Sequence, residues 1–316
     1  MYVLSYIVRR VASIIPVLIG ISILIFLIMQ VIPGDIVSIL LGTEATPELK
    51  EQMREEFGYN LPLYQQYWNW ISGVVVGDFG HSLRTGAAVL PEILSRFTLT
   101  LELTIFASVI AWIISIPLGV IAAVRRNKGS DIGIRVISLL GVSVPNFALA
   151  TIIILVLSLQ FNYFPPVGYV GLFEDPIRNL ERLLIPALVL GASMAGSIMR
   201  MTRSSVLEVL EQDYIRTARA KGIREHFVIY RHAFRNALIP VLTVIGMQIG
   251  FLLGGTVIVE QIFSLPGLGQ YVLTGIMQRD IPVVQGSILF IASMFVFVNL
   301  LVDILYGFLN PRISYD

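Results

Sequence analysis

Long apolar runs alternate with polar segments along the whole chain. The six longest runs cover residues 11–32, 99–124, 133–159, 183–203, 241–259 and 286–309. A helix needs about 20 apolar residues to cross the roughly 30 Å hydrocarbon core of a bilayer. Only helices and closed barrels satisfy all their backbone hydrogen bonds in lipid. The pattern therefore predicts an all-α membrane protein with six transmembrane helices.

Proline and small residues mark particular points inside these runs. Pro145 lies within the third run, where its missing backbone N–H predicts a kinked helix. The fourth run contains residues 191–193 (GAS) and 195–197 (AGS), and the fifth is rich in glycine. Small residues allow helices to approach closely in lipid. Close packing is therefore the favoured interpretation of these stretches, and lining of a pore is the alternative.

A long polar segment separates the first run from the second. It opens with a turn signal at residues 33–35 (PGD), and Thr46 is a candidate N-cap with Pro47 at the first helical position. An aromatic amphipathic stretch follows at residues 64–76, and its Tyr and Trp side chains favour the membrane interface. The expected division of the chain is an N-terminal tail with the first transmembrane helix (1–32), an extracytoplasmic helical segment (33–97) and a core with five transmembrane helices (98–316).

The charges are sorted by side of the membrane. Residues 33–97 carry eight acids against four bases, whereas residues 200–236 carry eight Lys or Arg against four acids. An excess of Lys and Arg near the ends of spans marks the cytoplasmic side. The charges therefore place the N- and C-termini in the cytoplasm, together with the loops after the second and fourth runs.

The first run follows Arg9 and Arg10, so a secretory or twin-arginine signal is an alternative for it. The run is too long for an ordinary signal, and no small-residue cleavage site follows it. We expect a retained first span.

The segment at residues 206–240 is too charged for lipid, yet its apolar residues recur at helical spacing. One set covers residues 206–214 and the other covers residues 227–238, with Gly222 between them. This pattern predicts a soluble helical hairpin between two spans, and its expected use is docking to a partner outside the membrane. A solvated, positively charged loop is the alternative.

Composition narrows the possible functions. The chain of 316 residues is 56% hydrophobic and 14% charged, whereas a soluble domain carries about 25% charged residues. It has no cysteine and three histidines, and it lacks HExxH, GxSxG and a glycine-lysine phosphate loop. We therefore expect a chain that is not an enzyme, with no ATPase of its own, no cofactor and no metal site.

Eight motifs spread along the chain carry a family resemblance. They are residues 6–16 (YIVRRVASIIP), 32–35 (IPGD), 77–82 (GDFGHS), 213–222 (DYIRTARAKG), 235–240 (RNALIP), 260–269 (EQIFSLPGLG), 279–285 (RDIPVVQ) and 299–312 (NLLVDILYGFLNPR). Together they resemble the membrane permease subunit of a binding-protein-dependent ABC importer. The chain is similar to the first of two paired permeases in the dipeptide, oligopeptide and nickel family, which includes dipeptide and glutathione permeases.

The resemblance implies a type I ABC importer permease fold with a cytoplasmic coupling helix between spans 4 and 5, at about residues 206–240. Such a helix docks in a groove of the ATPase subunit. The coupling residues implied here are Asp213, Tyr214, Arg216, Thr217, Ala218, Arg219, Ala220, Lys221 and Gly222. The general pattern is Glu-Ala-Ala, three residues and Gly. In this chain Arg216 stands in place of the glutamate, and the proline of the pattern is displaced to Pro240.

The resemblance also implies partners and a location. The partners are a second homologous permease, two cytoplasmic ATPase subunits that bind ATP and Mg, an extracytoplasmic solute-binding protein and membrane lipid, with no nucleic acid. The location is a bacterial or archaeal cytoplasmic (inner) membrane. The function implied is an ATP-driven translocation path for a small solute, with di- or oligopeptides first. Nickel complexes, glutathione, opines and oligosaccharides are the alternatives.

Four polar residues inside the runs are further candidates: Asp303, Asn299, Gln248 and Glu102. An ionisable residue within a span is a functional candidate by default. We expect Asp303 to pair with a cytoplasmic-side arginine, Arg312 being about two turns away, and Glu102 to reach the interface. Asn299 and Gln248 are expected to form hydrogen bonds between helices. An ion-coupled secondary transporter or channel is the alternative class, and Asp303 is its main support.

Overall fold

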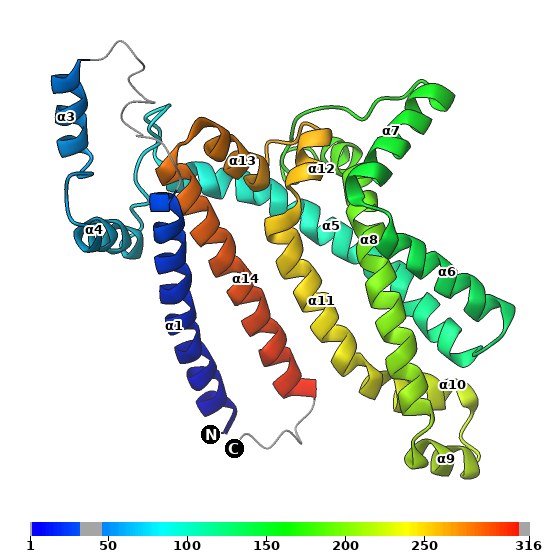
Figure 1. The fold of residues 1–316 in the computed structure, drawn as a ribbon. Helices are drawn as coiled ribbons and strands as arrows, with labels where there is room; N and C mark the ends of the chain where they lie inside the picture. The colour runs from blue at the N-terminus through cyan, green and yellow to red at the C-terminus, as the bar shows by residue number, and fades with distance from the viewer. Residues whose placement is uncertain (1, 32–45, 310–316) are drawn as a thin grey trace.

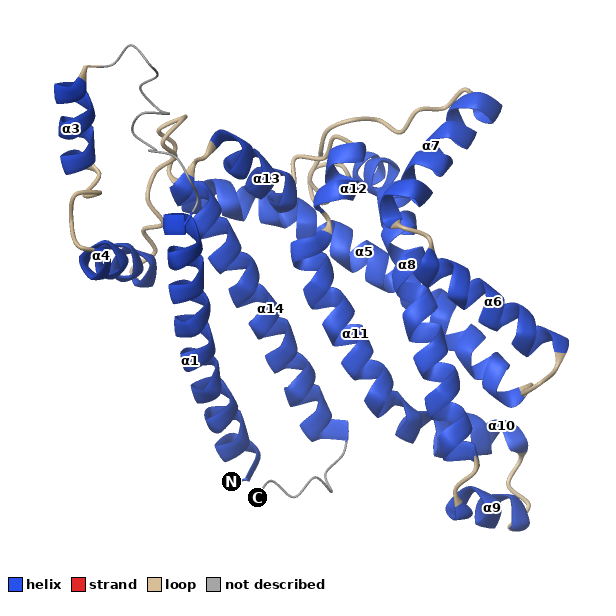
Figure 2. Cartoon of the chain, viewed as in Figure 1, coloured by secondary structure: helices blue, strands red, loops and turns tan. Residues whose placement is uncertain are grey.

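The computed structural model describes residues 2–31 and 46–309 (Figure 1). Within these ranges the regular structure is helical, apart from one isolated β-bridge between His81 and Ala88 (Figure 2). The turn expected at residues 33–35 and the chain end at residues 310–312 lie outside the described residues.

The helices have the following bounds. They are α1 (Tyr2–Val31), α3 (Pro47–Glu56), α4 (Leu63–Val75), α5 (Val89–Val124), α6 (Gly129–Ser143), α7 (Asn146–Phe161), α8 (Pro176–Leu210), α9 (Asp213–Ala220), α10 (Glu225–Phe227), the π-helix η1 (Val228–Phe234), α11 (Arg235–Gly255), α12 (Val257–Ile262), α13 (Leu268–Gln278) and α14 (Ile281–Leu309).

Several of these helices are long and apolar enough to cross a membrane. In the described ranges, five segments meet that condition: Arg9–Val31, Val89–Val124, Pro176–Leu210, Glu225–Gly254 and Ile281–Leu305. The bent pair formed by α6 and α7 makes a sixth if it is counted as one span. The prediction of an all-helical, multi-pass membrane protein is confirmed.

The third apolar run is broken, and the expected kink is a complete interruption. α6 ends at Ser143 and α7 begins at Asn146, and the two helices are bent by 102°. Val144 has an extended backbone (φ −83°, ψ 119°). The ring of Pro145 disfavours helical geometry in the preceding residue, and Pro145 has no N–H to continue the ladder. Residues 133–159 are therefore not one helix.

The core lies where α8 packs against α5, and Leu99, Leu103, Leu183, Leu190 and Ile198 are fully or almost fully buried there. α8 also contacts α6 and α11, α11 contacts α14, and α14 contacts α1 (Figure 1). This order places α5, α8 and α11 at the centre and α1 at one side.

Glycines sit at the closest helix contacts. A Cβ atom at Gly191 would lie 2.9 Å from the carbonyl oxygen of Ala107 on α5, and one at Gly196 would lie 2.6 Å from that of Ser138 on α6. On α11, Gly250 faces the ring of Phe295 on α14 in the same way. Such separations leave no room for a side chain, so close packing is confirmed for these positions.

The described part of the segment between the first two spans forms α3 and α4. Thr46 caps α3 by accepting a hydrogen bond from the N–H of Leu49 at 3.3 Å, with Pro47 at the first position as predicted. α4 lies against α1, where Tyr67 and Trp70 contact Phe26. The hydroxyl groups of Tyr67 and Ser22 are 2.8 Å apart. Aromatic contacts thus attach this segment to the first span.

A buried carboxyl group organises the end of the molecule where α12 and α13 lie. Glu260 is fully buried and accepts hydrogen bonds from the hydroxyls of Thr100 (2.8 Å) and Thr256 (2.7 Å) and from the N–H of Gln270 (2.8 Å). The Thr100 hydroxyl in turn accepts from the N–H of Leu268 at 2.9 Å. This network joins α5, α12 and α13 through bonds that need no basic partner.

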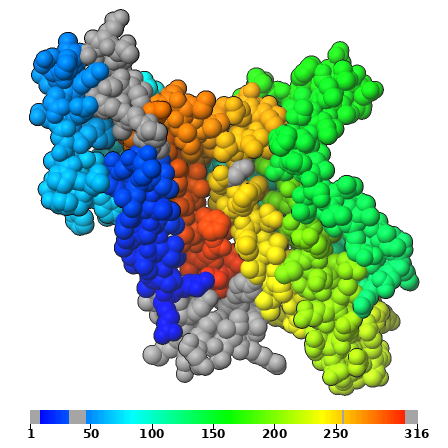
Figure 3. All heavy atoms as spheres, in the orientation of Figure 1, coloured from blue at the N-terminus to red at the C-terminus, as the bar shows by residue number. Residues whose placement is uncertain are grey.

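The opposite end of the molecule holds α9. Figure 1 shows the start of α1 and the end of α14 at the same end as α9, and α12 and α13 at the other. Drawn as spheres, the α9 region forms a yellow-green lobe below the long helices (Figure 3). The two ends thus differ in kind, one closed by packed helices and the other ending in a protruding helix.

Candidate functional site

The predicted hairpin at residues 206–240 contains only one short separate helix. Residues 206–210 are the last turn of α8, and α9 follows after a two-residue break. From Glu225 the chain passes through α10 and η1 directly into α11. The second half of the expected hairpin is therefore the continuation of a span, because its apolar periodicity runs into the next apolar run without interruption.

α9 is held by one narrow face. Ile215 and Ala218 are buried and pack against Val228, Ala233 and Ile223. Among the predicted coupling residues, Ala218 therefore faces the protein. The remaining eight are exposed, namely Asp213, Tyr214, Arg216, Thr217, Arg219, Ala220, Lys221 and Gly222. Together they leave most of the surface of α9 available to a partner.

Gly222 ends α9 in the left-handed conformation, with φ +74°. Its N–H donates to the carbonyl of Arg219 at 2.9 Å, and the N–H of Ile223 donates to that of Ala218 at 3.3 Å. These two bonds form a Schellman motif, which uses glycine because a Cβ disfavours positive φ. No other atom lies within 4 Å of the position of a Cβ, so conformation and not space requires glycine here.

Two polar links join α9 to the start of the next span. Arg219 donates to Glu225 through Nη2 (2.8 Å) and Nε (3.2 Å), and this contact raises the pKa of the Arg219 guanidinium. The Tyr214 hydroxyl donates to the carbonyl of His232 at 3.3 Å and accepts from Asn236 at 2.8 Å. A displacement of α9 would therefore act directly on η1 and α11.

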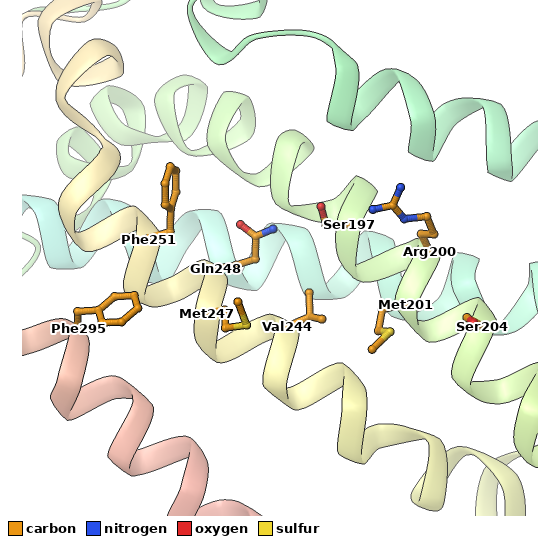
Figure 4. A pocket seen from close by; sticks show the side chains of 9 residues that line it. All are labelled: Ser197, Arg200, Met201, Ser204, Val244, Met247, Gln248, Phe251 and Phe295. Atoms are coloured by element: carbon orange, nitrogen blue, oxygen red, sulfur yellow. The ribbon is translucent and has the colours of Figure 1, made fainter. Parts of the chain in front are cut away.

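A cavity of about 680 Å³ lies between α8 and α11, and α14 closes one side. It is lined by Ser197, Arg200, Met201 and Ser204 of α8, by Val244, Met247, Gln248 and Phe251 of α11, and by Phe295 of α14 (Figure 4). On both α8 and α11 these residues recur at i, i+3, i+4 and i+7, which is one face of a helix. Two facing stripes thus form the cavity, while the glycines of the same helices occupy the packing faces.

The polar residues predicted inside the spans lie in different places. Gln248 lines the cavity. Asn299 donates to the carbonyl of Phe295 on its own helix at 2.9 Å, and no bond to another helix is recorded for it in the described ranges.

The two acidic candidates have partners on neighbouring elements. Asp303 accepts from Nε of Arg10 on α1 at 2.6 Å, and Arg312 lies outside the described residues. Glu102 accepts from the side-chain amide of Asn179 on α8 at 2.7 Å. These contacts fasten helices together, and neither carboxyl lines the cavity.

Sequence reasoning found the cavity only in part: Ser197 belongs to a stretch for which pore lining is the alternative, and Gln248 is a polar candidate. Arg200 was counted only as a basic residue at a span end, and Met201, Ser204 and Met247 were not considered. The signal was available in the polar residues at positions 197, 200 and 204, which share one helix face inside an apolar run. Without the neighbouring helix, however, that face cannot be distinguished from one exposed to water.

The long apolar helices of the described chain define a multi-pass membrane protein. A family described as "Binding-protein-dependent transport system inner membrane component" matches residues 115–315, and its N-terminal counterpart matches residues 3–104. The chain belongs to this family and is the permease subunit of a binding-protein-dependent ABC importer.

Relatives align with the chain over nearly its full length. It is 44% identical to a "Putative peptide transport system permease protein" of Brucella suis and 42% identical to the glutathione transport system permease protein GsiC of Escherichia coli. Each alignment covers 99% of both chains. Among solved structures, a chain of the inward-facing MetNI methionine ABC transporter matches 70% of this chain and 98% of its own length. The TM-score is 0.58 at 16% identity, which supports the expected type I importer permease fold.

Proposed function

We propose that this permease subunit forms the translocation path for small peptides, including di-, tri- and oligopeptides. The observation that carries this proposal is the 42–44% identity over 99% of the chain to permeases named for peptides and for glutathione, itself a tripeptide. The cavity supports it, because about 680 Å³ is within the usual size range of small-molecule sites. Nickel complexes, opines and oligosaccharides lack a comparable observation.

The proposed topology has six spans, with the α6–α7 pair counted as one and both chain ends in the cytoplasm of a bacterium. Three observations support it: the basic residues near α9, the acidic excess of residues 33–97, and the position of the start of α1 and the end of α14 beside α9 (Figure 1). The segment containing α3 and α4 would then face the extracytoplasmic solute-binding protein.

The proposed assembly contains a second homologous permease and two cytoplasmic ATPase subunits, which carry the ATP hydrolysis. α9 is the element that would lie in a groove of the ATPase, in the manner of a helix-in-groove contact. The exposure of eight of its nine predicted coupling residues supports this role. ATP-driven movement of the groove would reach α11 through Tyr214 and Arg219, and α11 forms one wall of the cavity.

Peptide uptake by the complete complex in vesicles tests the cargo. We expect labelled di- and tripeptides, glutathione included, to accumulate only when both ATP and the solute-binding protein are present. Uptake driven by an ion gradient without ATP would contradict the mechanism. ATPase activity stimulated by the loaded binding protein, with no peptide uptake, would reject peptides and keep the importer.

A charge reversal tests the docking role of α9. The Arg216 side chain is 73% exposed, and its one polar contact within the described residues is with Asp213, at 3.3 Å. Arg216→Glu should therefore weaken attachment of the ATPase subunits without lowering the thermal stability of the permease. Arg178→Glu, which alters an equally exposed arginine at the far end of α8, is the matched control and should leave attachment unchanged. Equal attachment in both variants would contradict the assignment of α9.

A further inference from the structure

Arg200 is the charged group that lines the cavity between α8 and α11. The other lining residues are two serines, a glutamine, two methionines, a valine and two phenylalanines, so the lining contains no acidic residue. Figure 4 shows the Arg200 guanidinium extended along α8 toward the side on which Ser197 and Gln248 lie. This direction agrees with the tendency of helical side chains to point back toward the N-terminus of their helix.

Arg200 has no protein partner in the described part of the chain, since no carboxylate there forms a hydrogen bond or ion pair with it. The buried carboxylate of the neighbouring helix α6 is already paired with other arginines. Asp131 of α6 is fully buried and accepts two hydrogen bonds from Arg203, at 2.6 and 2.9 Å, and Arg135 lies 3.4 Å from it. One carboxylate thus already serves two arginines.

The local charge is therefore positive. Arg200 also borders a second cavity of about 300 Å³ between α6 and α8, which Arg135 and Arg203 line as well. Two of these three arginines contact Asp131, and Arg200 contacts no carboxylate in the described residues, so the lining carries more positive than negative groups. Arg200 is exposed in the single subunit, so its guanidinium is accessible to water and to a ligand. An arginine within a span usually faces a water-filled path or a ligand.

We infer that the cavity is a binding site for a solute with a free carboxylate, and that Arg200 is the residue that recognises this carboxylate. Arginine suits this task because its planar guanidinium donates two parallel hydrogen bonds to the two carboxylate oxygens.

The remainder of the lining suits the variable part of such a solute. Met201 and Met247 are flexible thioether side chains that adapt to apolar groups of different shape. Gln248 offers both an acceptor and donors to a peptide bond, and Ser197 offers a hydroxyl. The inference rests on the proposed peptide function and narrows it, because neither a free metal cation nor a neutral oligosaccharide offers a negative charge to pair with Arg200.

A single introduced cysteine measures the charge of the cavity. The chain has no cysteine, so Ser197→Cys gives this subunit a single thiol. The thiol lies in the cavity, one helical turn from Arg200, and its labelling is measured on this subunit. In the complete permease–ATPase complex without binding protein, this thiol is treated with an anionic and with a cationic thiosulfonate reagent. The ratio of the two rates does not depend on the thiolate fraction. We expect the anionic reagent to react faster than the cationic one. The ratio of the two rates should fall about fivefold when Arg200→Gln is added, because Coulomb attraction over one helical turn in a hydrated site is of this size.

Two further variants control this measurement. Arg200→Lys keeps the charge and should keep the ratio. Arg178→Gln removes an arginine from the outer end of the same helix, where it pairs with Asp175, and should not alter the ratio. An unchanged ratio in Arg200→Gln would overturn the inference, and so would a thiol that reacts with neither reagent, since the cavity would then be closed to water.

Protection by a ligand measures recognition of the carboxylate. Dialanine with a free carboxylate should slow the labelling of the thiol in the Arg200 protein at least fivefold more than dialaninamide does at the same concentration. The two peptides should protect equally in Arg200→Gln. Equal protection in the Arg200 protein, or protection by neither peptide, would overturn the inference. The reagent ratio does not depend on the cargo, so a failure of peptide uptake with a preserved ratio would count against the proposed function alone.

Discussion

The two ends of the molecule are held in opposite ways. Around Glu260, five polar groups from α5, α12, α13 and the residue before α12 are wholly or partly buried and hydrogen-bonded to one another. At α9, two buried side chains and two exposed polar links attach an eight-residue helix. Buried, satisfied networks make a structure rigid, whereas exposed contacts can be exchanged for water at little cost. The comparison indicates that α9 can move relative to the spans and that the end around Glu260 stays fixed.

Removing the Glu260 carboxyl should have the largest effect on stability. Glu260→Ala removes the acceptor of the buried Thr100 and Thr256 hydroxyls and of the partly buried N–H of Gln270, and only Thr100 has another acceptor, the carbonyl of Arg96 at 3.4 Å. The free energy of unfolding should therefore fall by about 3–5 kcal/mol. Denaturant unfolding of the purified complex measures this. Gln261→Ala, at the exposed neighbouring position, is the control and should change it by less than about 0.5 kcal/mol. Similar changes in the free energy of unfolding for both variants would show that the Glu260 network does not make this end of the molecule rigid.

A comparison of two glycines tests whether the turn that ends α9 contributes to transport as well as to stability. Gly222 and Gly86 both have positive φ, +74° and +71°, and an added Cβ would meet no atom within 4 Å at either position. Alanine at each site should therefore cost a similar amount, about 1 kcal/mol. Only Gly222→Ala should lower the number of solute molecules transported per ATP, because the turn that contains Gly86 lies beside the end of α13, at the end of the molecule opposite to α9. A loss of transport in both variants would indicate a general effect of stability.

The Tyr214 hydroxyl tests the link between α9 and α11. Tyr214→Phe removes the bonds to His232 and Asn236, which are exposed, so stability should fall by only about 0.5 kcal/mol. Transport per ATP should fall about two- to threefold, since one of the two polar links between α9 and the start of the next span is lost. If transport per ATP in this variant equals that of the wild type, the contact between Arg219 and Glu225 alone connects α9 to the next span.

The ion pair between Arg219 and Glu225 should make the smallest contribution to stability among the contacts tested. A double-mutant cycle with Arg219→Gln and Glu225→Gln should yield a coupling free energy of about 0.3–1 kcal/mol that decreases at high salt. The pair of Arg216 and Asp213, whose side chains are 73% and 94% exposed, should give less. A larger coupling free energy in the second pair would show that exposure does not govern these contacts.

Much of the fold follows from the apolar pattern, and the differences have specific physical causes. The length of an apolar run identifies a span, but not the effect of one proline, so the break at Pro145 appeared as a kink. The periodicity of residues 227–238 is the same for a cytoplasmic helix and for an extension of a span. The sequence therefore predicts a longer hairpin than the structure contains. Gly222 was recognisable because a left-handed helix end strongly favours one residue type.

The cavity and the Glu260 network were less accessible to sequence reasoning. Both arise where residues far apart in the chain meet: positions 197–204 face positions 244–251, and Thr100 meets Glu260. A single sequence shows that Glu260 is acidic, but not that a fully buried position supplies three donors for it. Pairings of this kind are decided by the packing of whole helices.

The π-helix η1 fixes the rotational offset between the residues under α9 and the stripe of α11 that lines the cavity. A π-helix bonds each N–H to the carbonyl five residues back, so it holds more residues per turn than an α-helix. Deleting one residue from Val228–Phe234 would restore the α-helical ladder and rotate one part of the helix against the other by about 100°. Val228 and Ala233 could then pack under α9 only if Val244 and Gln248 left the cavity. The length of this segment, and not only its composition, therefore sets which residues of the next span face α9 and which face the cavity.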